Sequence, residues 1–546
     1  DQADTEESVS PSEILVTANR REQSLVEVPF AVTAVSGDIL EERALTDIRD
    51  FAALVPGFAI DDRGGTDLRL ILRGQNTGGA GASVATMMDD VVLSSTSALS
   101  NGSTVTPNFE TYDLERIEVL RGPQGTLYGR NTIGGAIKYV TAPLPDETAV
   151  KIRGTYGSYD QADLIVSAST PITDSLKIGA SGARLSRGGF GDNLTLGTEN
   201  YNKDVWAARG TIEFDNGPVM VRLSGDYIKD NSEARQGHRF IPGLVSGDPV
   251  LDDVFDTRAG LNIVDQEVEA YGGALNIALS LSDTLTFKSI TGYREDKSTT
   301  PIDFDSLAAV DLDVPAIYNN DQLSQELQLL YESDSLSGVV GFYYLDANAF
   351  TAFDVALFTT LNGLTAQTLG DVNTKTWSVF GDFTYDLSDT ISVSVGGRYT
   401  NDKRTSTVLR TTFLGGFSNL FGGTGVAAAV TSNFNGSATF KDFNPRASIS
   451  WQPNSDHNLY FTYSQGFKGG GFDPRGLSTA APDLNRDGVR SQQEIFDFLS
   501  FEPETVVAAS LQGLQEQNVL VPFTARYVAV VGGKPLTFRF NIDKRV

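Results

Sequence analysis

The chain has 546 residues with 70 acidic and 42 basic side chains, which gives a formal net charge of −28. This charge disfavours nucleic acid and anionic membrane surfaces as partners. The absence of cysteine excludes a disulfide framework, a thiolate metal site and a cysteine nucleophile, and the only two histidines, His238 and His457, are too far apart in sequence to favour a multi-histidine site.

The first residues form a polar leader to a short β-prone segment. Residues 1–12 are acidic and polar, which predicts disorder and the start of a mature protein whose signal peptide has been removed. Glu13 to Thr17 then read EILVT, a composition typical of a strand. An extended segment on a flexible tether suits strand addition to the exposed sheet edge of a partner. The alternative is an ordinary first strand of the domain that follows.

A mixed pattern of strand and helix follows this leader. Ala31 to Val35 is predicted as a strand, and helices are predicted over Gly37 to Ala44 and Asp47 to Leu54. Asp47 is placed to cap the second helix, and Pro56-Gly57 ends it. The pattern indicates a small α+β domain.

The stretch from Asp113 to Thr141 reads DLERIEVLRGPQGTLYGRNTIGGAIKYVT and joins two apolar strand patterns through a glycine-rich middle. Glycines this dense indicate tight turns and close backbone approaches, because only glycine adopts positive φ without a Cβ clash. A phosphate-binding loop is the alternative, but the stretch lacks both G-x-G-x-x-G and a Walker lysine. The pattern therefore predicts a compact, loop-rich module.

From Ala149 onward the apolar residues recur with a period of two. In VMVRLSGDY, Leu223 and Tyr227 fall on one face while Arg222 and Asp226 fall on the other, and ISVSVGGRYT over residues 391–400 follows the same rule. No apolar run is long enough for a transmembrane helix. One apolar face and one polar face per strand predict an antiparallel membrane β-barrel.

The connections between these strands alternate between short and long. Short turns are expected at 171–175, 215–218, 280–284, 333–338, 386–390 and 452–457. Long polar loops are expected at 187–203, 230–266, 294–321, 348–374, 401–440 and 466–502. This alternation is typical of periplasmic turns and extracellular loops, and about 16 strands can be read. A water-soluble β-sandwich is the alternative.

Three motifs give the chain a resemblance to the TonB-dependent outer-membrane receptors. They are EILVTANR from Glu13, like the TonB box, LRLILRGQN from Leu68, like an internal plug strand, and LRGPQGTLYGRNTIGGAI, like the end of the plug. The resemblance implies an N-terminal tail over 1–20, an α+β plug over 21–145 and a membrane β-barrel over 146–546 that holds the plug in its lumen. Family barrels have about 22 strands and usually end in an aromatic residue, whereas this sequence ends in valine.

The same resemblance implies where the chain works and with which partners. It implies the outer membrane of a Gram-negative bacterium, with the N-terminus in the periplasm and outer-membrane lipid around the barrel. The implied partners are TonB with its inner-membrane energising complex and a small-molecule or oligosaccharide ligand, with room for a surface lipoprotein or partner subunit and none for nucleic acid. The implied TonB box consists of Glu13, Ile14, Leu15, Val16, Thr17 and Ala18.

Four charged residues are candidates for ion pairs between the plug and the barrel. Arg73 and Arg121 lie on predicted plug strands. The motifs SQELQL and FEPETV, which carry Glu326 and Glu504, resemble barrel motifs whose glutamates face the plug. The two glutamates are expected to pair with the two arginines in the lumen and so to hold the modules in register. The alternative is four independently solvated charges.

Residues 483–494 read DLNRDGVRSQQE and match the pattern of an EF-hand loop over its full length. The expected oxygen ligands, which favour Ca²⁺, are Asp483, Asn485, Asp487, the carbonyl of Val489, Ser491 and Glu494. A helical pattern follows the loop, but none precedes it, so the motif is half an EF-hand. The alternative is an acidic solvated turn, and no organic cofactor is expected.

Four functions are weighed against these features. The first is TonB-dependent active import of a scarce ligand, namely an iron chelate, an oligosaccharide or a small aromatic compound. The second is a signalling receptor of the same family, which needs a further domain before Glu13, where only 12 residues stand. The third is a passive porin or structural barrel, which needs neither plug nor box. The fourth is a surface hydrolase, but no nucleophile with a base and an orienting group is visible, so an enzyme is not expected.

Overall fold

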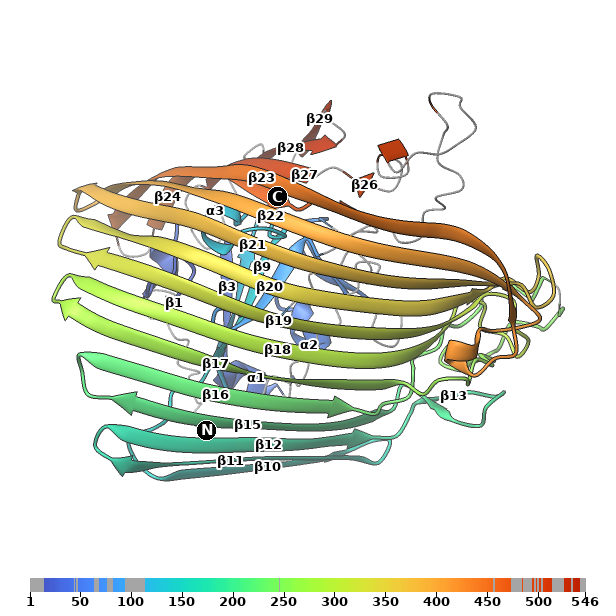
Figure 1. The fold of residues 1–546 in the computed structure, drawn as a ribbon. Coiled ribbons are helices and arrows are strands. Elements are labelled where there is room, and N and C mark those ends of the chain that lie inside the picture. Colours follow the sequence, from blue (N-terminus) through green and yellow to red (C-terminus); the bar gives the residue numbers. More distant parts are fainter. Residues whose placement is uncertain are drawn as a thin grey trace, which may run out of the picture.

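The computed structural model describes residues 14–43, 45, 48–62, 68–75, 82–93, 113–244, 246–454, 457–472, 484, 493–494, 497, 500–501, 504–512, 525–531 and 534–540. Figure 1 shows two modules, a small N-terminal domain and a curved sheet of long strands that wraps around it. No helix within the described residues is both long and apolar enough to cross a membrane.

The N-terminal module, here called the plug, is built on a five-stranded sheet with the order β3-β8-β9-β6-β7. Its strands are β1 Leu15–Val16, β2 Gln23–Ser24, β3 Val32–Ser36, β4 Phe58–Asp62, β5 Leu68–Leu72, β6 Val84–Met88, β7 Val91–Val92, β8 Leu114–Arg121 and β9 Gly135–Thr141. Its helices are η1 Leu25–Glu27, α1 Gly37–Glu42, α2 Ile48–Ala52 and α3 Gly125–Tyr128. The predicted first strand and two helices are confirmed as β3, α1 and α2, while the predicted cap Asp47 lies outside the described residues.

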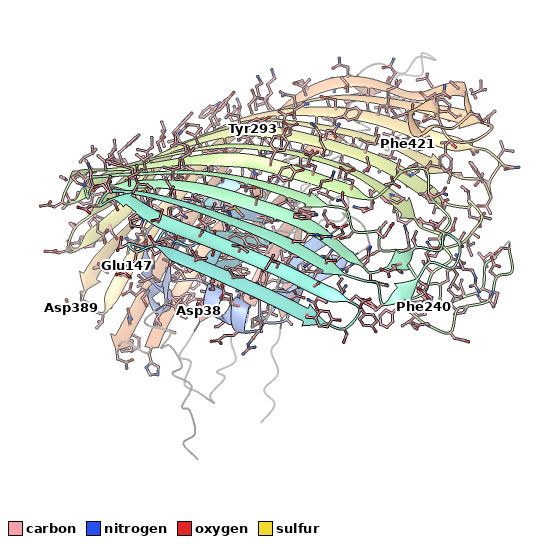
Figure 2. All side chains as sticks on the ribbon, turned by 90° about the horizontal axis from the view of Figure 1, so that it is seen from below. Asp38, Glu147, Phe240, Tyr293, Asp389 and Phe421 are labelled. Atoms are coloured by element: carbon pink, nitrogen blue, oxygen red, sulfur yellow. The ribbon has the colours of Figure 1, made fainter. Side chains whose placement is uncertain are left out.

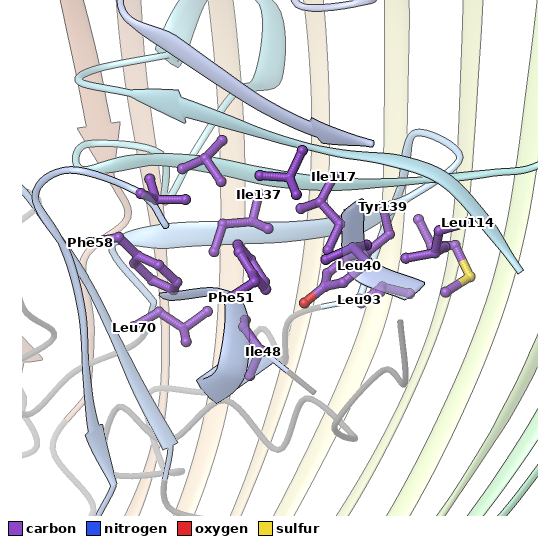
Figure 3. Packing of buried hydrophobic residues seen from close by; sticks show 14 of the residues in the cluster. Leu40, Ile48, Phe51, Phe58, Leu70, Leu93, Leu114, Ile117, Ile137 and Tyr139 are labelled. Atoms are coloured by element: carbon purple, nitrogen blue, oxygen red, sulfur yellow. The ribbon is translucent and has the colours of Figure 1, made fainter. Parts of the chain in front are cut away.

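The core of the plug lies between its sheet and the two helices α1 and α2 (Figure 3). Phe51 of α2 packs on Phe58 of β4 with ring centroids 5.8 Å apart, and Leu40 of α1 is buried in the same cluster. The cluster continues into the barrel wall through Leu185 and Val205. The apolar surface of the plug is therefore completed by the barrel, which ties the position of the plug to the sheet around it.

Gly135 opens β9 in a conformation that other residues rarely adopt. Its φ is +144°, and a Cβ at this position would collide with the backbone carbonyl oxygen of Leu120 on β8. β8 and β9 are antiparallel neighbours at this point. A glycine is therefore required at position 135, both because of its positive φ and because two strands approach each other closely there.

We expect Gly135→Ala to lower the free energy of unfolding of the plug by about 2–4 kcal/mol, because it adds backbone strain to a steric clash. Hydrogen exchange of plug amides in the detergent-solubilised protein measures this loss. The control is Gly154→Ala on the barrel, where the nearest atom to a new Cβ is the Asp163 oxygen at 4.0 Å. Equal exchange in both variants would contradict the role given to Gly135.

Within the described residues the barrel sheet contains 16 strands and is antiparallel from the first of them to the last. The strands in order are β10 Ala149–Gly157, β11 Gln161–Thr173, β12 Leu176–Arg187, β15 Lys203–Asp215, β16 Val219–Asp230, β17 Glu267–Ser282, β18 Leu285–Asp303, β19 Asp313–Glu332, β20 Leu336–Ala356, β21 Thr365–Ser388, β22 Ile391–Leu414, β23 Val426–Asn454, β24 His457–Lys468, β27 Glu504–Gln512, β28 Ala525–Val531 and β29 Lys534–Phe540. Short pairs β13 Gly191–Asp192 with β14 Glu199–Asn200, and β25 Gly471–Phe472 with β26 Ser500–Phe501, lie in the connections, and η2 covers Asn419–Phe421.

The two faces of the barrel strands differ as the period-two pattern predicts. Leu223 and Tyr227 of β16 are exposed on the outside, whereas Arg222 and Asp226 of the same strand make ion pairs on the inside with Glu213 and Arg294. In a bilayer, an apolar outer face contacts lipid while the polar inner face contacts the plug and water. The predicted barrel with a plug in its lumen is confirmed, and the soluble sandwich is not.

The long connections are shorter than predicted because the strands continue into them. The short turns gather at one end of the sheet, near Asp389, and the long connections at the other, near Phe240 and Phe421 (Figure 2). The loops predicted at 294–321, 348–374 and 401–440 are mostly the outer parts of β18 to β23. Polarity in these segments marks the end of the lipid layer, but the backbone ladder continues in water, so this prediction of loops was wrong.

Candidate functional site

The segment from Ile14 to Arg20 is docked inside the plug. β1 pairs with β2 in antiparallel fashion, with Leu15 opposite Ser24 and Val16 opposite Gln23. Val16 and Ala18 are both 0% exposed and pack in a cluster that includes Met87 and Leu120. The predicted strand is thus present as β1, although Glu13 lies outside the described residues. In this structure the segment is therefore buried against the rest of the plug.

Thr17 is held by three side chains of the plug. Its backbone N–H and its hydroxyl donate to Glu118 Oε1 at 2.9 and 3.2 Å. Lys138 Nζ donates to the carbonyl oxygen of Thr17 at 3.1 Å and to its Oγ1 at 2.6 Å. The Tyr128 hydroxyl lies within hydrogen-bond distance of the carbonyl oxygens of Thr17 and Ala18, at 3.1 and 3.0 Å. These contacts satisfy the backbone groups that an extended segment would otherwise offer to a partner strand.

Glu118 and Lys138 are directly opposite each other on β8 and β9. Their nitrogen and oxygen atoms are 3.8 Å apart, and the two side chains are 0% and 2% exposed. Sequence reasoning missed this pair, although the signal was present, since IEV and IKY each place one charge between two apolar residues. A buried pair of opposite charges across two strands is costly unless further hydrogen bonds satisfy it. Thr17 supplies such bonds, and Arg116 Nε donates to Glu118 Oε1 at 2.8 Å.

Arg20 extends this cluster from the plug to the barrel. Its guanidinium pairs with Asp90 at 2.7 Å and with Glu326 of β19 at 3.3 Å, and it lies over the ring of Tyr128 at 4.3 Å. Lys138 pairs with the same Asp90 oxygen at 3.1 Å. We call Arg20, Asp90, Glu118, Tyr128, Lys138 and Glu326 the latch cluster.

The electrostatics of the latch cluster keep its charges in place. Burial opposes ionisation of Asp90, but attraction by Lys138 and Arg20 holds the pKa of its carboxyl well below the usual value. Burial raises the pKa of Tyr128 to about 12, so its hydroxyl keeps its proton near neutral pH. The cluster therefore consists of two cations, three carboxylates and one neutral hydroxyl, all connected to the N-terminal segment.

The glycine-rich turn before β9 docks on the far wall of the barrel. Thr126 Oγ1 donates to the carbonyl of Asn444 on β23 at 3.0 Å, and the N–H of Asn131 donates to the carbonyl of Phe467 on β24 at 2.7 Å. A Cβ on Gly129 would lie 2.9 Å from the guanidinium carbon of Arg398 on β22. The turn has a glycine at position 129 because the barrel wall lies too close to its backbone to leave room for a side chain.

The predicted ion pairs between plug and barrel are only partly described. Glu326 does face the plug, and it pairs with Arg20, which was not among the expected partners. The pairing of Arg73 and Arg121 with barrel glutamates stays a prediction. Arg121 donates to the carbonyl of Pro56 at 3.1 Å, and the charges of Arg73 and Arg121 both act on Tyr460 of β24. β27 is the neighbour of β24, but the Glu504 side chain lies outside the described residues, so its pairing stays a prediction.

Most of the predicted calcium loop lies outside the described residues, namely Asp483, Asn485, Asp487, Val489 and Ser491. Glu494 is described and is buried, and its Oε1 accepts a hydrogen bond from the N–H of Leu484 at 2.6 Å. This hydrogen bond joins the beginning of the loop, at Leu484, to its last residue, Glu494, which was expected to supply the bidentate carboxylate. The occupancy of the loop by Ca²⁺ stays a prediction.

Two family models match the chain. The TonB-dependent Receptor Plug Domain matches residues 24–136, and the TonB dependent receptor-like beta-barrel matches residues 215–511, which is more than half of the chain. The vitamin B12 transporter BtuB of Vibrio vulnificus is 29% identical over 164 residues, covering 30% of this chain and 26% of that protein. The aligned part therefore spans about a quarter of this relative.

Solved structures resemble the whole chain in fold. The ferric yersiniabactin uptake receptor FyuA from Yersinia pestis has a TM-score of 0.72 at 18% identity, over 94% of this chain and 74% of that one. The ferric-catecholate import receptor Fiu from E. coli K12 has a TM-score of 0.65 at 13% identity, over 95% and 76%. The copper transporter OprC has a TM-score of 0.64 at 13% identity, over 94% and 75%. At these identities the likeness concerns the fold.

Proposed function

The chain belongs to the TonB-dependent receptors of the Gram-negative outer membrane, and from this premise we propose that it actively imports a scarce ligand with energy from TonB. The observation that carries the proposal is the docked N-terminal segment, whose backbone is held by the latch cluster. A passive pore needs no such segment. An active importer needs an N-terminal segment that is docked in the absence of ligand and becomes accessible to TonB when ligand binds.

The proposed mechanism starts from a closed state in which the segment from Leu15 to Thr17 is not available for strand addition to TonB. Leu15 and Val16 are already paired with β2, and the backbone of Thr17 is bonded to Glu118 and Lys138. A ligand that shifts the plug relative to β19 would break the pair between Arg20 and Glu326 and loosen the cluster. The freed segment then adds as a strand to TonB, whose pull rearranges the plug and opens the lumen.

The ligand class is inferred from chemistry and from the relatives. The described loops contain aromatic groups such as Phe190, which stacks on Tyr201 with ring centroids 4.7 Å apart and packs against Phe255. The relatives are named for ferric siderophores, vitamin B12 and copper. We therefore propose a metal chelate first, and an oligosaccharide or small aromatic compound second.

The test is receptor-dependent growth and uptake in a deletion strain complemented with the gene. The panel contains labelled ferric hydroxamate and catecholate chelates, cobalamin, a copper salt, maltodextrins and aromatic acids. At least one compound should enter only when the receptor, TonB and the proton gradient are all present. Receptor-dependent entry that persists without TonB would overturn active import in favour of a passive pore.

We further propose that residues 483–494 bind Ca²⁺ from the external medium. The expected result is that Ca²⁺ slows hydrogen exchange of this loop and that Glu494→Gln removes the effect, because the mutation removes a bidentate ligand. Asp497→Asn, three residues later and exposed, is the matched control for charge. A wild-type loop whose exchange is the same with Ca²⁺ and with chelator would contradict the proposal.

A further inference from the structure

A second group of acidic residues lies far from the plug, at the tip of the hairpin between β18 and β19. Asp303 ends β18, Asp313 begins β19, and the two are directly opposite each other in the strand pairing. Asp305 lies in the connection between them. Like charges in opposite positions of an antiparallel pair repel each other, so this arrangement needs a compensating charge.

All three carboxylates are buried and close together. Asp303, Asp305 and Asp313 are 6%, 7% and 1% exposed. One oxygen from each can be chosen so that all three lie within 4.8 Å of one another. Water therefore does little to screen the repulsion, and in a medium of low dielectric constant it is far stronger than on a surface.

Two of the carboxylates are fixed in place by backbone donors. Asp303 accepts from the N–H of Ser306 at 2.7 Å and from the N–H of Gly260 at 2.8 Å, which lies in the long connection between β16 and β17. Asp305 accepts from Leu307 at 2.8 Å and from Leu312 at 2.6 Å. These bonds orient the two groups. The Oδ1 atoms of Asp303 and Asp305 each accept one of them, so each Oδ1 keeps a lone pair for a further contact.

Within the described residues the third carboxylate, Asp313, has no backbone donor, and its side chain is in hydrogen-bond contact with that of Asp305. Asp313 Oδ1 is buried and has no hydrogen-bond partner within the described part of the chain, and it lies beside the other two groups. Among the described residues, none of the three carboxylates makes an ion pair with lysine, arginine or histidine. Arg239 donates to the backbone carbonyl of Asp305 at 2.6 Å and makes no ion pair with the three carboxylates of the described cluster. A carboxylate at this depth without a donor requires a proton or a cation.

The geometry points to a site for a hard divalent cation of the Ca²⁺ class at Asp303, Asp305 and Asp313. All the donors are oxygens, which Ca²⁺ prefers, and two ligands of one Ca²⁺ ion can lie up to about 5 Å apart. A bound ion offsets the repulsion and joins the hairpin to the long connection through Asp303 and Gly260. The ion thus stiffens two outer loops at once, and the site is independent of the loop at 483–494.

The test compares Asp313→Asn with wild type in the full-length, detergent-solubilised protein, with the Glu494→Gln change in both so that the other loop is silent. We expect calorimetry with CaCl₂ to show one site, weakened at least about ten-fold by Asp313→Asn. Ca²⁺ should also slow exchange of residues 304–312 and of Gly260, but only when Asp313 is present. In chelator, Asp313→Asn should raise the melting temperature, because it removes the repulsion with Asp303.

Asp389→Asn, on an exposed turn at the other end of the sheet, controls for loss of one charge. If Asp313→Asn fails to fold, Asp305→Asn replaces it with the same expectations. No Ca²⁺ heat in the protein that retains Asp313, or Ca²⁺ binding unchanged by Asp313→Asn, overturns the site. A melting temperature that follows pH but not Ca²⁺ also overturns it, since a proton then compensates the three carboxylates.

Discussion

Deletion of Glu13 to Ala18 is expected to abolish energised uptake and to leave binding of the imported compound at the cell surface intact. The deletion removes β1 and Thr17, which are the groups that TonB would capture by strand addition. The loops near Phe240 and Phe421 lie at the opposite end of the barrel and are not touched (Figure 2). Uptake and surface binding of the compound identified by the panel measure the two effects separately.

The matched control removes six residues upstream, from Ala3 to Ser8, which shortens the tail equally and spares β1. Full uptake is expected from this variant. Because the deletion of Glu13 to Ala18 also removes hydrogen-bond partners of Lys138 and Tyr128, the amount of folded receptor must be compared by surface binding. Undiminished uptake after deletion of the segment would show that TonB does not bind the receptor through it.

Lys138→Met is expected to release the docked segment in the absence of any ligand. The change removes one of the two donors to the Thr17 carbonyl and the cation that Asp90 and Glu118 share, so that Asp90 keeps Arg20 and Glu118 keeps Arg116. Removing one partner of a buried pair costs about 3–5 kcal/mol. The remaining pairs with Arg20 and Arg116 place this change at the lower end of that range, and local opening of the segment admits water to the exposed carboxylates. Hydrogen exchange of residues 14–20 should therefore be at least about 100-fold faster, since about 3 kcal/mol corresponds to that factor.

Lys151→Met is the matched control, because Lys151 pairs with Glu41 on the surface and its side chain is 59% exposed. An exposed pair contributes less than about 1 kcal/mol, so exchange of residues 14–20 should not change. A purified periplasmic domain of TonB should also bind the Lys138→Met receptor without ligand. Exchange and TonB binding equal to wild type would mean that the latch cluster does not hold the segment.

Much of the fold follows from local patterns in the sequence. The period of two in segments such as Val219 to Tyr227 requires one wet and one apolar face, and this pattern was enough to predict the barrel. The glycine-rich stretch before β9 predicted tight turns and close approaches, and both are present at Gly135 and Gly129. These features could be predicted because each depends on residues that are neighbours along the chain.

The ends of the strands could not be predicted in the same way. The outer parts of β18 to β23 are polar, and polarity alone does not distinguish a hydrated strand from a hydrated loop. The backbone ladder decides between them, because each strand continues as long as its neighbour supplies hydrogen-bond partners. The opposite placement of Asp303 and Asp313 depends on that continuation, and it cannot be read from either segment alone.

The sequence by itself determined the class of the protein, the order of its modules and the residues from which the N-terminal segment is made. Only the tertiary structure decided which partners hold that segment, since Arg20 reaches Glu326 across some three hundred residues of chain. The physical reason is that a buried charge is stabilised by whichever opposite charge the packing brings within a few ångströms. Sequence motifs named the candidates Arg73 and Arg121, whereas the packing brought Arg20, in the turn between β1 and β2, to Glu326.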